Sequence, residues 1–511
     1  MAGTFSAPLT EARGFTAAPA DLDKLAVVVG CSSAGVGLSP FYFSGGAAVA
    51  GVGYGDAVDI LTQIIEQRQA SGNAGNKLPA ALYSTPITTT GAYGTIDTSG
   101  VAGTSVVTVD SSSKPYGTYE ARIRVYLGGT VGSAGVQLQW SLDAGRTWSN
   151  IIGLGTATSF TIPNSRVKLN FAAGTLTTGD LIAVRTLAPA PSSADVAAAF
   201  SALATSGLDF SIVVLGFPVS ASLVPTITTG LNALAAVGKR VLLLAPTRIP
   251  NAETPESETA WLSSIAADFA AYTDSRICMR AGYGLVTDAM TSRVYLRSTI
   301  AQFAADVVRC DRSTWPCAPA DQPESSVTLS DYTGNTVGHD EGPMGGATGL
   351  SNETLGNRFS CEQRITNPAT RQAVFNTVPW VLYAADERIR NMMVRRIANA
   401  MERVAFAAVI QNFGAKAFYT PPNPNVVGSQ ATLTPTSRRA IQGTVYGILS
   451  TVFASDIKNA NDANIETGLV QVSSTVTVTG GNLLTVPMTL APEVAGYVLS
   501  IPMLFAIKGA A

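Results

Sequence analysis

Three short apolar runs constrain the fold of this chain more than any other feature. Leu25–Val29, Ser211–Gly216 and Val241–Ala245 are almost purely aliphatic and end at a glycine or a proline. Strands that are apolar on both faces are typical of a parallel sheet covered by helices on both sides. Between the runs lie segments with helical character, Ala194–Thr205 and Thr226–Ala236. This alternation predicts right-handed crossovers and an α/β core with a mostly parallel sheet.

Further segments complete this core. Gly55–Gln69 has apolar residues at helical spacing, and Asp56 stands near its start as a cap. Gly238 follows the predicted helix Thr226–Ala236 at the position where a glycine ends a helix. The other elements that we expect are strands at Ile277–Ala281 and Glu362–Arg364, and helices at Glu258–Tyr272, Val294–Val308 and Asp386–Gln411.

The segment 86–186 differs in composition and in the spacing of its apolar residues from the core segments on either side of it. Helical spacing is absent, and threonine, serine, glycine and valine dominate. Apolar and polar residues alternate in Tyr119–Leu127, which is typical of a strand with one buried face. Further strands are predicted at Val136–Trp140, Ser159–Ile162, Arg166–Phe171 and Leu181–Thr186. Short strands at this spacing predict an all-β sandwich, inserted into the α/β core.

An Asp-box motif lies inside this insertion. The stretch Ser141-Leu-Asp143-Ala-Gly145-Arg-Thr147-Trp148 matches the pattern S-x-D-x-G-x-T-W. In such a turn the aspartate accepts backbone N–H groups, the glycine supplies a positive φ, and the tryptophan packs beneath. The motif predicts a well-formed hairpin without a catalytic role. Contact of this domain with a carbohydrate is the alternative.

Both ends of the chain are predicted to extend from the folded parts. Met1–Lys24 is polar and poorly periodic, as an extended arm would be. After the linker Pro421–Ser429 we expect a helix at Pro435–Phe453, capped by Thr434, and then strands between Gly468 and Ile507. We expect the last strand to lack a local partner. A neighbouring subunit would supply one, because unpaired strand edges promote aggregation.

The side chains available for proton chemistry are few. The 511 residues include one histidine, His339, and 13% are charged, against about 25% in a typical soluble domain. No apolar run approaches the ~20 residues that cross a bilayer. Residues 1–20 lack the basic start and apolar centre of a secretory signal. The sequence favours a structural protein over an enzyme and predicts synthesis in a cytoplasm, without insertion into a membrane.

Basic residues gather at one place in a chain whose net charge is −2. They are Arg388, Arg390, Arg395, Arg396 and Arg403. Their spacing indicates the surface of a helix rather than the basic face of a nucleic-acid-binding protein. We therefore expect no direct contact with nucleic acid.

The five cysteines do not have the spacing of a metal site. They are Cys31, Cys278, Cys310, Cys317 and Cys361. They include no CxxC pair, and His339 is too isolated to complete a zinc site. Cys310 and Cys317 could approach each other across a loop, but reduced and mostly buried thiols are the favoured state in a cytoplasm.

Three other groups of residues are candidates for a functional site. The loop Gly30–Gly37 follows a strand but lacks the endings of nucleotide-binding loops, so we expect a tight turn there and no nucleophile at Cys31. His339-Asp340-Glu341 fits a solvated loop, with a metal site or an acid–base pair as the alternative. Asp306, Arg309, Asp311 and Arg312 are predicted to form surface or interface ion pairs. We therefore expect no catalytic, cofactor-binding or metal-binding residues.

The layout resembles that of the tail sheath proteins of contractile phages and related injection systems. The strand Leu25–Gly30 with the turn Ser32–Gly35 is similar to the V-x-G-x-A-x-x-G opening of that family. Arg297–Ala320 is similar to a segment in the middle of the family's core. The stretch from Gly468 to Ile507, with Pro492-Glu493 before a final strand, is similar to its β-rich end. The resemblance covers most of the chain and depends strongly on the order of the domains.

The resemblance implies a division of the chain and a function. The parts would be an N-terminal arm (1–24), a first part of the α/β core (25–85), an outward-facing β-sandwich (86–186), a second part of the core (187–420) and a C-terminal α+β region with a terminal strand arm (421–511). Six-fold rings would stack around a tail tube, and both arms would add strands to neighbouring subunits. Contraction would drive the tube through a host envelope without a nucleotide.

The same resemblance implies partners and a location for the protein. The tube protein, the baseplate and the tail terminator would contact the sheath, which would assemble in the host cytoplasm and belong to the virion tail. Deletion of Met1–Pro19 or Gly496–Ile507 would leave a folded monomer that cannot polymerise. Two alternatives stay open: another tail or capsid structural protein, and a glycan-binding protein that uses the Asp-box domain.

Overall fold

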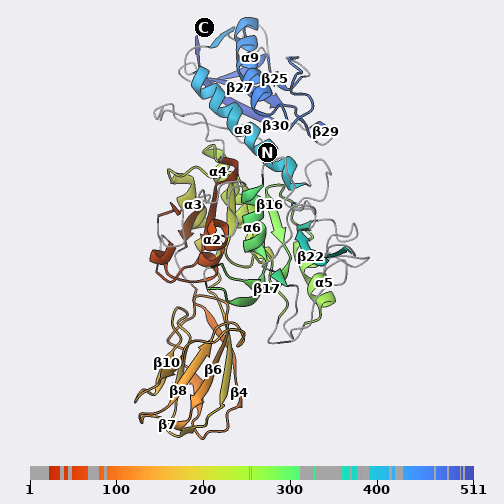
Figure 1. Cartoon of the computed structure of the whole chain (residues 1–511). Coiled ribbons are helices and arrows are strands. Elements are labelled where there is room, and N and C mark those ends of the chain that lie inside the picture. Colours follow the sequence, from red (N-terminus) through yellow and green to blue (C-terminus); the bar gives the residue numbers. More distant parts are fainter. Residues whose placement is uncertain are drawn as a thin grey trace.

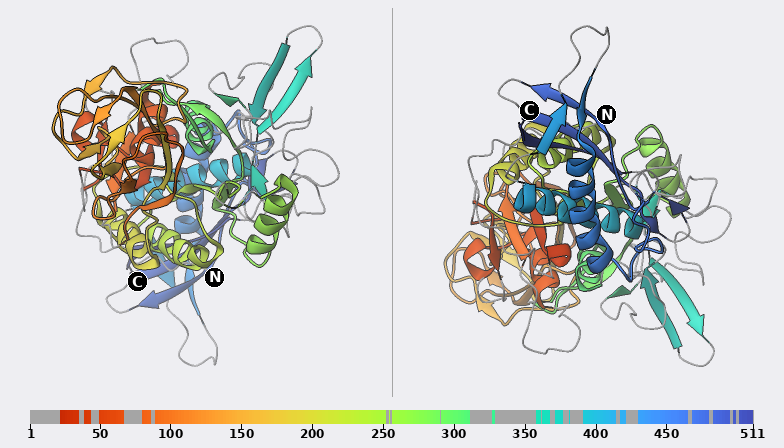
Figure 2. Two further views of the ribbon diagram at one scale, coloured as in Figure 1. Left: turned by 90° about the horizontal axis from the view of Figure 1, so that it is seen from below. Right: turned by 90° about the horizontal axis from the view of Figure 1, so that it is seen from above.

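The computed structural model describes residues 22–34, 39–43, 49–66, 80–85, 89–251, 254, 256–289, 291–310, 327–328, 358–360, 362–367, 371–376, 381, 391–413, 417–420, 430–464, 468–479, 483–494, 497–498 and 501–510. In Figure 1 the α/β core lies in the middle, with the orange β domain at one end and the blue C-terminal region at the other. The two views along this axis in Figure 2 place these two parts on opposite sides of the core.

A seven-stranded sheet forms the centre of the core. Its order is β2-β3-β1-β14-β15-β16-β20, and its pairs are parallel except for β2 against β3. The strands are β1 (Ala26–Gly30), β2 (Phe41–Phe43), β3 (Ala80–Ser84), β14 (Ile212–Leu215), β15 (Leu242–Pro246), β16 (Ile277–Arg280) and β20 (Phe359–Ser360). The predicted α/β core with a mostly parallel sheet is confirmed.

Helices bury both faces of this sheet. In β1, Ala26 and Val28 join one hydrophobic cluster, and Val27 and Val29 join another. The first cluster includes residues of α2 (Asp56–Glu66) and α6 (Ile300–Arg309), and the second includes residues of α3 (Ser193–Thr205), α4 (Val224–Ala236) and α5 (Glu258–Phe269). This two-sided burial explains why the strands are apolar throughout.

The start of α2 packs directly onto the strands at the carboxyl edge of the sheet. A Cβ at Gly30, the last residue of β1, would lie 2.6 Å from the Cβ of Ala57, and one at Gly216 would lie 2.7 Å from it. The strand order reverses direction between β1 and β14, which is where many α/β proteins bind ligands. In this chain the first turn of α2 takes that place.

The β domain consists of small antiparallel sheets around one core. The larger sheet has the order β4-β13-β6-β8-β9, a second has β10-β11-β5, and β7 pairs with β12. Residues of both larger sheets, such as Ile123 and Leu169, share one hydrophobic cluster. The strands are β4 (Ala92–Gly100), β5 (Val107–Val109), β6 (Glu120–Leu127), β7 (Gly129–Thr130), β8 (Gln137–Ser141), β9 (Ile152–Gly153), β10 (Ser159–Thr161), β11 (Lys168–Phe171), β12 (Thr175–Leu176) and β13 (Leu181–Leu187).

Two helix predictions need correction. Val294–Ser298 is not helical but forms strand β18, which pairs with β17 (Tyr283–Thr287), and α6 begins at Ile300. The sequence pattern predicted a helix here because it does not show that β17 lies alongside and pairs with these residues. Helix α8 spans Met392–Phe413, beyond the predicted end at Gln411, while residues 386–390 lie outside the described part.

The C-terminal region combines α8 and α9 (Pro435–Val452) with a sheet that closes on itself. The Oγ1 of Thr434 accepts a hydrogen bond from the backbone N–H of Ser437 at 3.3 Å, so the predicted cap is confirmed. The pairings β23–β24, β24–β26, β26–β27, β27–β30 and β30–β23 complete a ring, and β25 also pairs with β27. The strands are β23 (Ala417–Thr420), β24 (Ala431–Leu433), β25 (Val470–Val472), β26 (Thr475–Thr479), β27 (Leu483–Leu490) and β30 (Ile501–Ala510).

The last strand therefore has partners inside its own chain. Residues 501–508 of β30 pair with all eight residues of β27. The expectation of a terminal strand without a local partner is wrong for this strand. Its deletion would open the ring and remove the buried Met503, so loss of stability of this region is expected together with any loss of assembly. The N-terminal arm, residues 1–21, lies outside the described residues.

We predict that Gly30→Ala destabilises the core by roughly 1–3 kcal/mol, because the new methyl group would overlap with Ala57. Urea unfolding measures the loss. Gly443→Ala is the matched control, since a Cβ at this glycine of α9 meets no atom within 4 Å and a helical alanine is favoured over glycine by up to about 1 kcal/mol. Equal unfolding midpoints for Gly30→Ala and the wild type would contradict the close contact.

Candidate functional site

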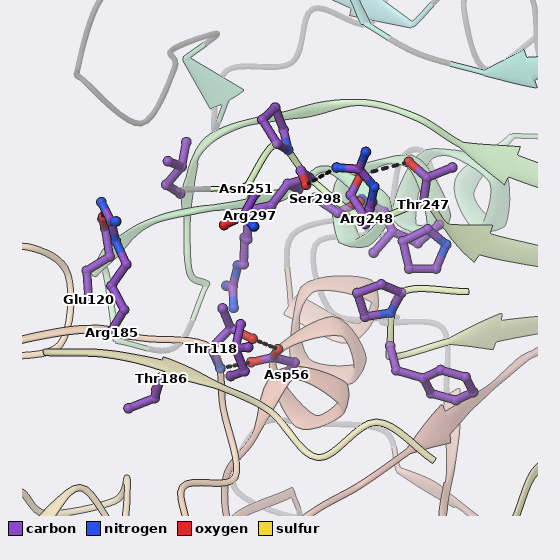
Figure 3. A pocket seen from close by; sticks show the side chains of 18 of the residues that line it. Asp56, Thr118, Glu120, Arg185, Thr186, Thr247, Arg248, Asn251, Arg297 and Ser298 are labelled. Atoms are coloured by element: carbon purple, nitrogen blue, oxygen red, sulfur yellow. Dashed lines mark hydrogen bonds and ion pairs between the residues drawn. The ribbon is translucent and has the colours of Figure 1, made fainter. Parts of the chain in front are cut away.

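The candidate site is the joint at which the β domain meets the carboxyl edge of the central sheet. A cavity of about 1050 Å³ lies there, between α2, the ends of β14 and β15, and the β domain. Figure 3 shows Asp56 and Thr118 facing each other at the foot of this cavity, with Glu120 and Arg185 side by side away from them. Polar side chains from both parts of the chain thus meet at the cavity wall.

Asp56 links the first helix of the core to the β domain. Its carboxylate accepts hydrogen bonds from the backbone N–H of Thr118 at 3.0 Å and from the Thr118 hydroxyl at 2.8 Å. Asp56 is also the first helical residue of α2 rather than a cap that precedes it. The side chain predicted to start a helix therefore also holds the neighbouring domain.

A second link joins α2 to the hairpin β17–β18. A guanidinium nitrogen of Arg297 lies 2.7 Å from the Asp59 carboxylate. The same guanidinium lies 4.7 Å from the centre of the Tyr295 ring. Burial lowers the pKa of Arg297, but the carboxylates of Asp59, Asp288 and Asp56 together outweigh burial, and the net pKa lies above the ordinary value. The ion pair therefore fixes β18 against α2.

The Asp-box forms the hairpin that the sequence predicts. The Asp143 carboxylate accepts hydrogen bonds from the Ser141 hydroxyl at 2.7 Å, the Thr147 N–H at 2.9 Å and the Thr147 hydroxyl at 2.8 Å. Gly145 has a φ of +81°. The guanidinium of Arg124 lies 4.6 Å from the centre of the Trp148 ring, so this ring has a cation on its face.

The Asp-box also forms hydrogen bonds to the α/β core, and the sequence motif gives no sign of these contacts. Asp143 accepts a hydrogen bond from the backbone N–H of Val294 at 3.3 Å, and Arg146 donates one to the Val294 carbonyl at 3.3 Å. The next residue, Tyr295, is 5% exposed and belongs to the hydrophobic core of the β domain. The Asp-box thus bonds the backbone of strand β18, and the Tyr295 side chain of that strand packs in the core of the β domain.

Other charged groups at the cavity are also paired. Both guanidinium NH groups of Arg248 donate to the Glu256 carboxylate, at 2.6 and 2.8 Å. These hydrogen bonds lower the pKa of Glu256 below its ordinary value. Arg185 lies 3.4 Å from the Glu120 carboxylate. These ion pairs connect segments of the chain that line the cavity.

The described part of the loop Gly30–Gly37, which was compared with nucleotide-binding loops, is held by hydrogen bonds to other segments. The Ser33 hydroxyl accepts a hydrogen bond from the backbone N–H of Tyr54 at 2.9 Å, and the Cys31 sulfur lies 3.3 Å from the Thr85 hydroxyl. Burial raises the pKa of the Cys31 thiol, which disfavours the thiolate. Gly35, Val36 and Gly37 lie outside the described residues, as do His339, Asp340, Glu341, Cys317 and Cys361.

The arginines of α8 form a second joint, at the amino edge of the sheet. Arg396 is 5% exposed and donates to the Cys310 carbonyl at 3.0 Å. Arg403 donates to the Arg240 carbonyl at 2.6 Å and pairs with Asp23. The prediction of a helix surface is wrong for these two residues, because Arg396 bonds the end of α6 and Arg403 bonds the segments before β1 and β15. Arg388 and Arg390 lie outside the described residues.

Asp306 also departs from the surface prediction. It is fully buried in α6, all of whose residues from Ile300 to Val308 are buried. Asp311 and Arg312 lie outside the described residues. Cys278 and Cys310, like Cys31, are buried and form no disulfide. Within the described ranges, no group of three or more histidine, cysteine, aspartate or glutamate residues could hold a metal ion, and no helix is long and apolar enough to cross a bilayer.

We predict that Asp143→Asn lowers the free energy of unfolding by about 1–3 kcal/mol at pH 7, because the amide NH2 cannot accept the hydrogen bonds of the carboxylate. Burial raises the pKa of Asp143, but the hydrogen bonds from Thr147 and Ser141 outweigh it, and the net pKa lies below 3.8. The stabilisation is therefore full above pH 3.8 and is lost as the pH falls through the folded-state pKa.

The measurement is urea unfolding of both proteins at several pH values between 7 and 2. The difference between wild type and Asp143→Asn should shrink only at the acidic end. Asp97→Asn is the control and should change stability less, because Asp97 is exposed in strand β4 of the same domain, where its carboxylate accepts a hydrogen bond from the Ser99 N–H. A difference that does not vary with pH would show that the charge of Asp143 does not matter.

We predict that Tyr295→Ala loosens the β domain from the core and costs about 3 kcal/mol, by loss of a buried aromatic side chain. Limited proteolysis should then cut faster at the two connections between the domains. Tyr126→Ala removes a tyrosine that is 50% exposed in the same domain and should leave cleavage unchanged. Equal cleavage of the two variants would argue against Tyr295 as an anchor.

Comparisons with known proteins identify only remote similarity. No family model and no curated protein matches the chain. Among solved structures, the chain is similar to a sheath tail protein from Desulfitobacterium hafniense, at 11% identity and a TM-score of 0.45, over 94% of this chain and 96% of that one. It is also similar to a chain of the anti-feeding prophage baseplate, at 14% identity and a TM-score of 0.33, over 64% and 73% of the two chains. Both TM-scores lie below 0.5, so the function proposed for this chain depends on its own sequence and contacts.

Proposed function

We propose that this chain is a structural subunit of a contractile tail sheath. The observation that carries the proposal is the placement of the β domain, strands β4–β13, between β3 and β14 of one parallel sheet, with a closed C-terminal sheet after the core. This is the order of parts that the sequence resemblance implies. The subunits would polymerise as stacked rings around a tail tube.

The joints suit a protein that transmits force. Asp56, Asp143 and Arg146 bond the β domain to the core, and Arg396 and Arg403 bond α8 to the opposite edge. Because each joint includes a buried charged side chain, Asp143 at one edge and Arg396 at the other, the three parts would move as one body during contraction. The free energy for contraction would come from a change in contacts between subunits, as in other rigid-body transitions.

The partners follow from this role. Neighbouring copies would contact each other in six-fold rings, with the N-terminal arm adding a strand to a neighbour. The tail tube, the baseplate and the tail terminator would contact the sheath, and the outward-facing β domain would lie on its surface. The subunit would assemble in the host cytoplasm and belong to the virion tail. Its work would be mechanical, without catalysis, cofactor or direct contact with nucleic acid.

We predict that the purified chain forms hollow tubes, visible by negative-stain electron microscopy. Deletion of residues 1–19 should abolish the tubes, because these residues would bridge neighbouring subunits, while circular dichroism and the unfolding midpoint stay as in the wild type. Normal tubes without residues 1–19 would refute the role of the arm. A wild-type chain that stays monomeric at all concentrations would refute the sheath function itself.

The alternative of another tail or capsid component predicts a different particle. Closed shells or short single rings would favour it over a sheath. Sugar affinity of a monodisperse monomer would favour the glycan-binding alternative, for which the cation on the Trp148 ring is unfavourable because an accessible aromatic face is what sugar rings usually stack on.

A further inference from the structure

A small pocket lies in the β domain, beside the two connections that join this domain to the core. Its volume is about 410 Å³, and the described residues that line it include three cations and no acidic side chain. The cations are Lys114, Arg166 and Lys168. We propose that this pocket binds a phosphate group, either as the free ion or as a small phosphate ester. Binding would take place within a single chain, so it does not depend on the proposed sheath function.

Two segments of the β domain bring these cations together. Lys114 lies in the loop from β5 to β6, whereas Arg166 lies in the turn between β10 and β11 and Lys168 begins β11. The Ser113 hydroxyl donates to the Arg166 carbonyl at 2.7 Å, which ties the loop to the turn. The Tyr93 hydroxyl of β4 donates to the same carbonyl at 3.0 Å and accepts from the Lys168 N–H at 3.1 Å. The wall of the pocket is therefore held in place by hydrogen bonds within the protein.

The guanidinium of Arg166 is held beside an aromatic ring. It lies 4.6 Å from the centre of the Tyr116 ring and donates a hydrogen bond to the Tyr116 hydroxyl at 3.3 Å. Tyr116 in turn packs edge-on against Tyr54 of the core, with the ring centres 6.3 Å apart. A guanidinium stacked on a ring keeps N–H donors at its edge, in a planar fork that matches the geometry of phosphate. Arg166 thus offers donors suited to a phosphate group.

The positive charge in the pocket is only partly balanced by the protein. The Lys168 ammonium lies 2.8 Å from the Asp110 carboxylate. Hydrogen bonds from Lys168 and Ser112 lower the pKa of Asp110, so this carboxylate is ionised at neutral pH. In the described part of the chain, Lys114 and Arg166 form no ion pair with a carboxylate. Their charges remain for a ligand, because a cleft lined by one sign of charge attracts ions of the opposite sign.

A phosphate group fits these charges and donors better than a carboxylate does. A phosphate monoester carries a charge of about −1.5 to −2 at pH 7 and several acceptor oxygens, whereas a carboxylate carries a single negative charge. Arginine binds phosphate through paired N–H groups, and lysine binds it as a point charge. Thr90, which is exposed at the pocket, adds a hydroxyl group. The volume of the pocket also leaves room for a substituent on the phosphate.

A bound phosphate would strengthen the attachment of the β domain to the core. The pocket is lined by Thr90 and Gly91 in the connection between β3 and β4, and by Pro189 in the connection between β13 and α3. A Cβ at Gly91 would overlap with the carbonyl oxygen of Pro115, so the first connection packs against the loop that carries Lys114. A ligand held by this loop would therefore lie against both connections and make them less accessible to proteases.

Equilibrium dialysis of the full chain with radiolabelled inorganic phosphate tests the proposal. The wild type should show saturable binding that weakens as sodium chloride is added, because salt screens the cations. Lys114→Gln and Arg166→Gln should each weaken binding by about tenfold or more, since each removes a charged donor. Lys114 has no carboxylate partner among the described residues, so Lys114→Gln should keep the wild-type unfolding midpoint in phosphate-free buffer.

Arg122→Gln is the matched control. It removes the same charge from strand β6 of the same domain, at a residue that does not line the pocket, and should bind phosphate as the wild type does. Competition with unlabelled glycerol 1-phosphate separates the two sources of the phosphate group: stronger competition than by inorganic phosphate indicates an ester, and weaker competition indicates the free ion. Absence of saturable binding, or equal losses for Arg122→Gln and Arg166→Gln, would overturn the site.

Limited proteolysis supplies a second readout. Phosphate should slow cleavage at the two connections in the wild type but not in Lys114→Gln. Equal rates with and without phosphate in the wild type would overturn the site as a bridge between the two parts. Absence of tubes from the same protein would refute the sheath function and leave phosphate binding unaffected, so the two failures are distinguishable.

Discussion

Burial of the central sheet on both faces is the constraint on which the rest of the structure depends. Because alternate residues of β1 enter two different hydrophobic clusters, neither face of the sheet is available for another domain. Only the strand ends remain. The β domain meets the carboxyl ends, and α8 with the C-terminal region meets the amino ends, which produces the elongated arrangement in Figure 1.

Contacts at strand ends differ from contacts between sheet faces. Strand ends present backbone N–H and C=O groups, which must be satisfied when they are buried. The chain meets this need with charged side chains: Asp143 and Arg146 bond both backbone groups of Val294, and Arg403 bonds the carbonyl of Arg240. Such charge-assisted hydrogen bonds are stronger than neutral ones. Several of the few charged residues thus lie inside the joints rather than on the surface.

Features that depend on residues close together in the sequence could be predicted, and the structure confirms them. The apolar runs are central strands, Thr434 caps α9, Gly238 has a φ of +84° after α4, and the Asp-box forms its turn. β4 escaped prediction because its residues, rich in glycine, serine and threonine, are mostly exposed and lack a regular apolar alternation.

Contacts between distant residues could not be foreseen. Asp143 and Val294 are separated by 151 positions, and Arg403 and Arg240 by 163. Each residue looks like an ordinary turn, strand or helix-surface residue when considered alone. The arginines of α8 are an example, because helical spacing shows that they share a face but not what that face contacts. Only the fold of the core places carbonyl groups opposite them.

Two kinds of contact hold the parts of the proposed sheath subunit together. Single charged side chains bond backbone groups at the strand ends of the core, as Asp143 and Arg403 do. A backbone ladder of eight residue pairs joins β30 to β27 and closes the C-terminal sheet. A side-chain bond is lost when the interface between two parts opens, whereas the ladder is lost only when the sheet itself opens. The joints would therefore be the weaker points of a subunit under load, and closure of the sheet also pairs a strand edge that would otherwise promote aggregation.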